Sequence, residues 1–396
     1  MPSSTAPIQS TDITINDPLL EPIVEKVRAG VRLTESDGLQ LYETQDVWTL
    51  CSLADEVRRK LHGDVAYYNI NRHINYSNVC ALSCKFCDFY RKKDQEGAYE
   101  YSIEDIKKEA HGATEAGATE IHIVGGLHPW LPFTYYTDAI RAIRDVAPNI
   151  HVKAFTAVEI VHLAKISKRG RDGNAGITSV INDLIDAGLG SLPGGGAEVF
   201  DDRVHDEAFR GKIRGQQWMD VHRVAHELGL NSNATMLYGH IESRVERLRH
   251  MSLLREEQDR ANEDSIQGKF QAIIPLPFVP GVSEFAHLPG PSGLENLRTI
   301  AILRLMLDNV PHVKAFWIMQ TLHMAQHMLQ CGADDIDGTV VWYDITKVSS
   351  TSTHQECTVK DLERAIVDAG FTPVERDTLY RTVHRNGTNW TVAEQN

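Results

Sequence analysis

Three cysteines lie close together in the chain, at Cys80, Cys84 and Cys87, in a C-x3-C-x2-C pattern. Three thiolates from one short loop can bind three irons of a 4Fe-4S cluster and leave the fourth iron open to another ligand. A structural zinc site is the alternative, but it would need a fourth protein ligand, and no His or Cys follows at the usual finger spacing. The pattern therefore predicts an iron–sulfur cluster with one open iron.

The remaining cysteines, Cys51, Cys331 and Cys357, are scattered along the chain. Six cysteines in 396 residues are too few for a disulfide framework. We interpret the three scattered thiols as packing groups, because a free cysteine usually behaves as a small buried apolar residue.

Short glycine-rich or polar segments recur farther along the chain and could form the rest of a binding site. Gly125 and Gly126 would let a ligand approach their backbone, although a plain turn is the alternative. Thr156 and Glu159 offer a hydroxyl and a carboxylate to a ligand. Thr followed three residues later by Glu is also the sequence of a helix capping box, so both interpretations stay open.

A second group of polar residues adds carboxylates and imidazoles. Glu198 follows a run of three glycines that lacks the Lys-Ser/Thr of a phosphate-binding loop. His240 and Glu242 belong to one short segment, and His128 follows the glycine pair closely. Most of the 18 histidines should be surface or hydrogen-bonded core residues, and position singles out His128 and His240 as functional candidates.

Strands and helices must bring these residues to one place. From Val65 onward, short apolar or β-branched segments alternate about eight times with amphipathic helical segments. This alternation predicts an α/β fold, a (β/α)8 barrel of the TIM type, whose active site lies on the loops after the strands. The strands are predicted at Val65–His73, Glu120–Val124, His151–Thr156, Gly188–Leu192, Asn231–Leu237, Phe270–Ile274, Val313–Met319 and Gly338–Val341.

We expect an extension at each end of the barrel. The predicted divisions are a helical N-terminal extension over residues 1–64, the barrel over residues 65–357, and a small helix–strand appendage over residues 358–396. Helices are predicted at Pro18–Ala29, Asp46–Leu61, Ser102–Ala116, Phe133–Val146, Gly176–Asp186, Gln216–Leu228, Gly293–Leu307 and Thr358–Ala369, with an edge strand at Thr372–Leu379.

Composition restricts the possible partners. The formal net charge of −14 would repel a phosphate backbone, so we expect no nucleic-acid partner. The segment Met1–Asp17 has neither the basic nor the apolar region of a signal peptide, and no apolar run is long enough to span a bilayer. These features predict a cytoplasmic protein without a membrane partner.

The segment Asn71–Arg91, which contains the three cysteines, resembles a group of radical S-adenosylmethionine (SAM) enzymes that includes futalosine-pathway enzymes and deazaflavin synthases. The resemblance runs from roughly Tyr67 to Leu379. Later segments are more narrowly similar to the aminofutalosine synthases of menaquinone biosynthesis, namely Val124–Pro129, Val152–Glu159, Pro193–Glu198, Leu237–Glu242 and Gly332–Thr339.

The resemblance implies that SAM binds the open iron through its methionine amino and carboxylate groups. It places the aromatic ring of Phe86 against the adenine and the backbone of Gly125 and Gly126 at the methionine amino group. By their positions after predicted strands, the expected further contacts with SAM are Thr156, Glu159, Glu198 and Glu242. The expected partners of the substrate carboxylates are Arg72, His128 and His240.

The resemblance also implies a reaction. An electron from the reduced cluster cleaves SAM to methionine and a 5′-deoxyadenosyl radical, and this radical adds to the vinyl carbon of 3-[(1-carboxyvinyl)oxy]benzoate. Migration of the aryl group and loss of a carboxyl group then give 6-amino-6-deoxyfutalosine. A donor such as flavodoxin or ferredoxin would supply the electron. Such chemistry requires positioning and exclusion of water more than acid–base catalysis.

Two other functions are possible. In the neighbouring pathway enzyme, cyclic dehypoxanthinylfutalosine synthase, the radical abstracts hydrogen instead of adding to the substrate. The Gly-Leu-His-Pro and Lys-Ala-Phe-Thr-Ala-Val-Glu segments favour the adding enzyme. A non-catalytic iron–sulfur electron carrier would need a fourth cysteine near the first three, and the sequence has none there.

Overall fold

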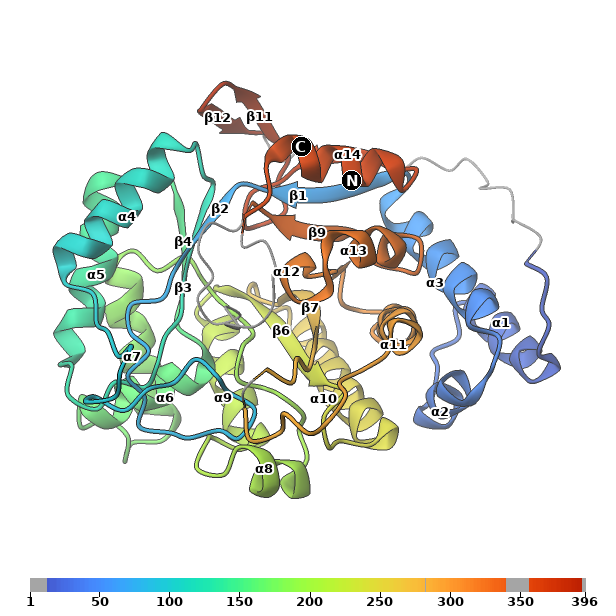
Figure 1. Ribbon diagram of the computed structural model, residues 1–396, viewed down its shortest axis with the longest axis horizontal. Coiled ribbons are helices and arrows are strands. Elements are labelled where there is room, and N and C mark those ends of the chain that lie inside the picture. The colour runs from blue at the N-terminus through green and yellow to red at the C-terminus, as the bar shows by residue number, and fades with distance from the viewer. Residues whose placement is uncertain (1–12, 282, 340–355, 394–396) are drawn as a thin grey trace.

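The computed structural model describes residues 13–281, 283–339 and 356–393. A curled sheet of seven parallel strands forms most of a barrel (Figure 1), and neighbouring strands follow one another in chain order. The strands are β2 (Asn71–Ile74), β3 (Glu120–Ile123), β4 (His151–Ala154), β5 (Ser191–Leu192), β6 (Asn231–Tyr238), β7 (Phe270–Pro277) and β8 (His312–Val313).

Two further strands close the ring. β1 (Val65–Asn69) leads into β2 and pairs in parallel with β9 (Asp335–Gly338). β9 meets the chain just after β8, where the backbone N–H of Ala315 donates to the carbonyl of Asp335 at 2.7 Å. Eight strand positions therefore surround one interior, and the predicted (β/α)8 fold is confirmed.

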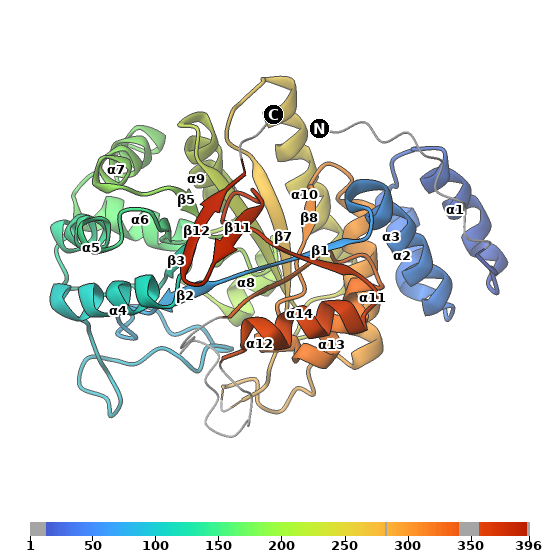
Figure 2. The ribbon, with the colours of Figure 1, turned by 90° about the horizontal axis from the view of Figure 1, so that it is seen from above.

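Helices cover the outside of the sheet, as the view from above shows (Figure 2). Local capping starts several of them; the Ser102 side chain, for example, accepts from the backbone N–H of Asp105 at 3.2 Å. Within the described part of the chain, no helix is both long and apolar enough to cross a membrane. The covering helices are α4 (Ile103–Glu115), α5 (Phe133–Val146), α6 (Ala157–Ile166), α7 (Asn174–Ala187), α8 (Asp202–Ala208), α9 (Gly215–Glu227), α10 (Arg244–Glu263), α11 (Gly293–Met306), α12 (Trp317–Gln320) and α13 (Leu322–Leu329).

The N-terminal helices pack on one side of the barrel, against α10 and α11 (Figure 1). They comprise η1 (Pro18–Leu20), α1 (Glu21–Arg28), α2 (Glu35–Glu43) and α3 (Val47–His62). The contact includes a hydrogen bond from the Arg298 guanidinium of α11 to the backbone carbonyl of Thr44, at 2.6 Å. The division into an extension, a barrel and an appendage stays a prediction.

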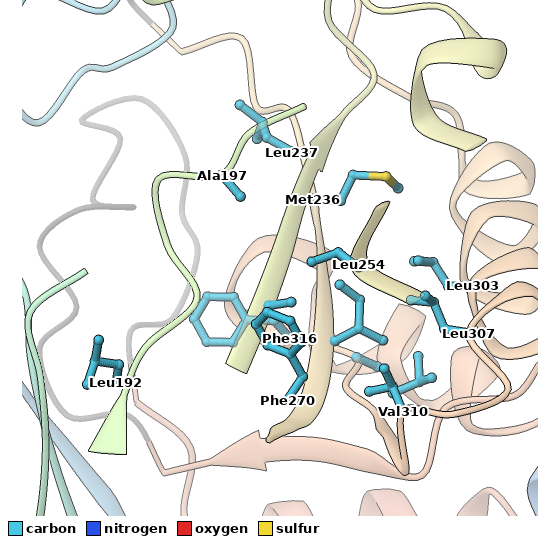
Figure 3. Packing of buried hydrophobic residues seen from close by; sticks show 14 of the residues in the cluster. Leu192, Ala197, Met236, Leu237, Leu254, Phe270, Leu303, Leu307, Val310 and Phe316 are labelled. Atoms are coloured by element: carbon cyan, nitrogen blue, oxygen red, sulfur yellow. The ribbon is translucent and has the colours of Figure 1, made fainter. Parts of the chain in front are cut away.

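Apolar side chains between the sheet and its helices form the core. Met236 of β6 and Phe270 of β7 face Leu254 of α10 and Leu303 of α11, and all four are at most 1 % exposed (Figure 3). Burying an apolar side chain of this size stabilises the fold by about 1.5–3 kcal/mol. This packing holds the strands, and thereby the loops that follow them, in place.

The C-terminal region covers the end of the barrel at which the strands begin. β10 (Thr372–Glu375) pairs with β1 as an edge strand, as predicted, but it ends before the predicted boundary at Leu379. The chain after β10 then enters the N-terminal end of the barrel. There Tyr380 stacks on His312 with ring centroids 3.5 Å apart. Gln271 donates to the carbonyl of Thr378 at 2.8 Å. The other C-terminal elements are α14 (Val359–Asp368), β11 (Val383–Asn386) and β12 (Asn389–Val392).

Every predicted strand differs from the observed one by at least one residue at an end, and three show a further difference. Val65–His73 divides into β1 and β2, because its two halves pair with different neighbours. Val313–Met319 is wrong beyond Val313, since a buried apolar run can form either a strand or a helix, and α12 begins at Trp317. The strand expected at Gly338–Val341 ends at Gly338, and its residues 340–341 lie outside the described residues.

Candidate active site

The three cysteines lie on the loop after β2, at the end of the barrel where the strands finish. The sulfur of Cys80 accepts from the backbone N–H groups of Leu82 and Leu127, both at 3.4 Å. Burial raises the pKa of Cys84 to about 11 and also raises that of Cys87. Because a metal is bound by thiolates, a positive charge near this loop would favour the form of the cysteines that binds it.

Lys212 supplies that charge, and it was not among the residues predicted to form the site. Its ammonium group is ion-paired with Glu198 and lies 5.3 Å from the centre of the Phe86 ring. It is close enough to Cys84 and Cys87 to lower the pKa of both thiols. Although burial lowers the pKa of Lys212, Glu198 and the two sulfur atoms raise it above its ordinary value. A single lysine in a loop carries no spacing signal that could have identified it.

The glycine pair packs directly against the segment that leads into the cysteine loop. A Cβ atom on Gly126 would lie 2.3 Å from the carbonyl oxygen of Val79, and one on Gly125 would lie 2.7 Å from the Tyr76 ring. Contacts this short exclude any side chain at either position. The chain's own packing therefore requires both glycines, and their contact with SAM stays a prediction.

Thr156 and Glu159 form the capping box that their spacing predicts. One oxygen of Glu159 accepts from the backbone and the hydroxyl of Thr156, both at 2.8 Å. The other oxygen accepts from the backbone of Gly125 at 3.1 Å and from the Tyr76 hydroxyl at 2.9 Å. Burial raises the pKa of Glu159 to about 7, and these donors oppose the shift. Glu159 thus connects the start of α6 to the glycine pair, and its contact with SAM stays a prediction.

Replacing Glu159 by Gln is expected to destabilise the fold by about 1–3 kcal/mol, because the new NH2 group would face a donor on one side. The free energy of unfolding in urea measures this loss. Asp105→Asn is the matched control, since Asp105 occupies the same place in the exposed capping box of α4, and a smaller loss is expected there. An unchanged free energy of unfolding in Glu159→Gln would contradict the connecting role.

His240 and Glu242 lie in the loop after β6. The His240 ring stacks over the Phe86 ring, with the two ring centroids 6.5 Å apart. Burial lowers the pKa of His240, and its Nε2 lies 3.2 Å from the carbonyl of Leu237. Glu242 accepts from Arg247 at 2.7 Å and from the backbone of His240 at 2.9 Å. The Glu242 side chain is fully buried by these partners, so it holds the loop, and its contact with SAM stays a prediction.

His128 and Arg72 both have partners within the protein. His128 lies on the loop after β3, and its contact with the substrate stays a prediction. His128 is 2 % exposed, accepts from the backbone of Leu131 at 3.1 Å and has its Nε2 2.8 Å from Glu100, so it organises its own loop. Arg72 forms an ion pair with Glu109 of α4, on the outside of the barrel. Successive residues of a strand face opposite sides, and the neighbour that faces inward is His73. The expectation that Arg72 contacts the substrate therefore needs correction.

The structure brings most of the predicted residues into two groups beside the cysteine loop. The first group surrounds Phe86 and contains Glu198, Lys212 and His240, with Glu242 behind His240. The second group connects Gly125, Gly126, Thr156 and Glu159 through Tyr76, whose hydroxyl also donates to the carbonyl of Gly126 at 3.0 Å. Three thiols with polar groups on both sides could hold a cluster and a zwitterionic ligand together.

Comparisons with known proteins agree with this arrangement. Residues 74–254 match the radical SAM superfamily, and residues 268–387 match the CofH/MqnC C-terminal region. The chain is 42 % identical to the aminodeoxyfutalosine synthase of Thermus thermophilus, covering 93 % of this chain and 97 % of that one. It is 44 % identical to the enzyme of the same name from Streptomyces coelicolor, covering 90 % and 92 %.

The chain is also similar to more distant proteins. A 5-amino-6-(D-ribitylamino)uracil–L-tyrosine 4-hydroxyphenyl transferase from Methanopyrus kandleri is 35 % identical over 85 % of this chain and 90 % of its own length. Among solved structures, methylornithine synthase superposes with a TM-score of 0.69 over 89 % of this chain and 97 % of its own, at 16 % identity. At that identity the likeness concerns the fold alone.

Proposed function

The chain belongs to the radical SAM superfamily and, within it, to the aminodeoxyfutalosine synthase family, and we therefore propose that it joins the adenosyl group of SAM to 3-[(1-carboxyvinyl)oxy]benzoate. The bond forms at the vinyl carbon, the aryl group migrates, and a carboxyl group is lost. The products are 6-amino-6-deoxyfutalosine and methionine. It is a radical SAM enzyme of the futalosine pathway, and the cyclising alternative is not favoured.

One observation supports this proposal above the others. Cys80, Cys84 and Cys87 lie on one loop at the strand ends of the barrel, beside the buried cation of Lys212. A 4Fe-4S cluster bound there would supply the electron that cleaves SAM. The residues fit such a group, because the loop offers three thiols and the backbone N–H groups of Leu82 and Leu127 already point at one sulfur.

The surrounding residues bind and position SAM in this proposal. Phe86 offers a ring face to the adenine, and the charge of Lys212 lowers the pKa of Cys84 and Cys87, against the larger effect of burial. Glu159 and Tyr76 hold the glycine pair still, so that the reacting groups meet in one geometry. Flavodoxin or ferredoxin as the electron donor, and a cytoplasmic location, remain parts of the same proposal.

The fate of the adenosyl group tests the reaction. Reconstituted enzyme is incubated under anaerobic conditions with SAM labelled in its adenosine, dithionite and the carboxyvinyloxybenzoate. An adding radical is incorporated into product, so mass spectrometry should find the label in an aromatic-containing adduct that has lost one carboxyl group. A parallel incubation contains dehypoxanthinylfutalosine in place of the benzoate. If the label appeared only in 5′-deoxyadenosine and dehypoxanthinylfutalosine was cyclised there, while the benzoate stayed unchanged in the first incubation, the alternative enzyme would be correct.

A further inference from the structure

A layer of polar side chains crosses the barrel interior near the carboxyl ends of the strands. His73, His122 and Lys153 are in register on β2, β3 and β4. Lys314 follows β8 on the far side of the ring. His122 is close enough to Lys153 and Lys314 for their charges to lower its pKa, although the two lysines belong to opposite parts of the ring. The four side chains therefore lie in one region of the barrel interior.

Each lysine in this layer has a carboxylate beside it. Lys153 lies 2.7 Å from Glu120, and Lys314 lies 2.9 Å from Asp337. All four side chains are at most 6 % exposed. Removing such pairs from water costs about as much as their attraction returns, so their burial is poorly explained by stability. Buried groups of charged side chains are common at functional sites, so this layer is a candidate for one.

His122 shows that the layer borders a hollow. Its side chain keeps some accessible surface, although its ring lies inside the barrel with its centroid 4.6 Å from that of His73. Its Nε2 atom is buried and has no hydrogen-bond partner within the described ranges of the chain. A buried ring nitrogen without a hydrogen-bond partner raises the free energy of the folded protein. A ligand group that formed this hydrogen bond would remove that cost.

The wall of this hollow on β7 is apolar. Ser232 on β6 faces outward, where its hydroxyl binds His222 of α9 at 2.8 Å. Alternation along β6 then turns Thr235 and Leu237 inward, and their partners in register are Ile274 and Leu276. Both β7 side chains keep some accessible surface, and Lys314 lies beside Ile274, since its backbone N–H donates to the carbonyl of Ile273.

We propose that this layer is the subsite that binds the ring carboxylate of an aryl carboxylate substrate. The carboxylate accepts hydrogen bonds from the side chains of Lys153, Lys314 and His122, and the aromatic ring packs on Ile274 and Leu276. Each ammonium group has three N–H donors and gives one to its partner carboxylate, so donors remain for the ligand. The inference rests on the proposed function. It assigns to the barrel interior the binding of a substrate carboxylate, which had been expected of Arg72.

Binding measurements on the whole enzyme test the subsite. The cluster-loaded protein is titrated anaerobically in a calorimeter with the carboxyvinyloxybenzoate, with SAM present and no reductant. The same titration uses the analogue whose ring lacks the carboxylate. His122→Phe removes a donor, and Lys314→Gln removes the charge but can still donate to Asp337. In both variants we expect the affinity for the benzoate to fall about 10-fold to 100-fold, as for a lost hydrogen bond to a charged group.

The controls separate this role from a structural one. The affinity for the analogue and for SAM should be unchanged in both variants. His222→Phe removes a fully buried histidine outside the barrel interior, so we expect it to lower the free energy of unfolding but to bind both ligands as the unmodified protein does. Equal losses for the benzoate and its analogue, or no loss for either, would overturn the subsite. If the unmodified enzyme bound neither ligand, the proposed function itself would fail.

Discussion

We expect the variants Cys80→Ala, Cys84→Ala and Cys87→Ala, each reconstituted anaerobically with iron and sulfide, to lose the 4Fe-4S cluster and all cleavage of SAM. The loop provides three thiols for three irons, so each loss leaves an iron without its protein ligand. The loss of SAM cleavage should therefore be complete, whichever cysteine is removed. Iron and sulfide content per chain, with the electron paramagnetic resonance spectrum of the reduced protein, measure the cluster directly.

Cys357→Ala is the matched control for these variants. Cys357 is also a partly buried free thiol, but it lies just before α14, where its backbone N–H donates to the carbonyl of Thr339. This variant should keep the full iron content and cleave SAM normally. A normal cluster after loss of Cys80, Cys84 or Cys87 would show that the ligands had been assigned incorrectly.

Gly126→Ala is expected to have the largest effect among changes that leave the three thiols in place. Its Cβ atom would lie 2.3 Å from the carbonyl oxygen of Val79, which belongs to the backbone directly before Cys80. Neither backbone segment can yield without moving the cysteine loop. Overpacking of this kind costs about 1–3 kcal/mol of stability. We also expect SAM to bind more weakly, because the loop and the glycine pair move apart.

Urea unfolding and calorimetric titration with SAM measure the two effects of Gly126→Ala. Gly112→Ala is the control, since this glycine lies inside α4 and its Cβ atom would lie 3.4 Å from the Arg72 guanidinium, an ordinary contact. Alanine inside a helix is more stable than glycine by up to about 1 kcal/mol, so this control should gain stability. Equal unfolding curves for the two variants would contradict the close approach at Gly126.

Features that depend on residues close in sequence were predicted well. The spacing of Cys80, Cys84 and Cys87 limits them to one loop, and Thr156 with Glu159 forms the predicted capping box, because capping uses bonds within a single helical turn. The helix Phe133–Val146 agrees with α5 at both ends. Alternating strands and helices were enough to predict the barrel, since βαβ units in one sheet have few possible arrangements.

By itself, then, the sequence determined the three cysteines, the fold class and the family, because each depends on spacing or on a pattern along the chain. The tertiary structure alone decided which side chains meet. It turned Arg72 outward to Glu109, placed Lys212 beside the thiols, and brought Lys153 and Lys314 together across the barrel. These outcomes follow from which face of a strand a residue occupies and from how the barrel closes, and both are set by contacts between segments far apart in the chain.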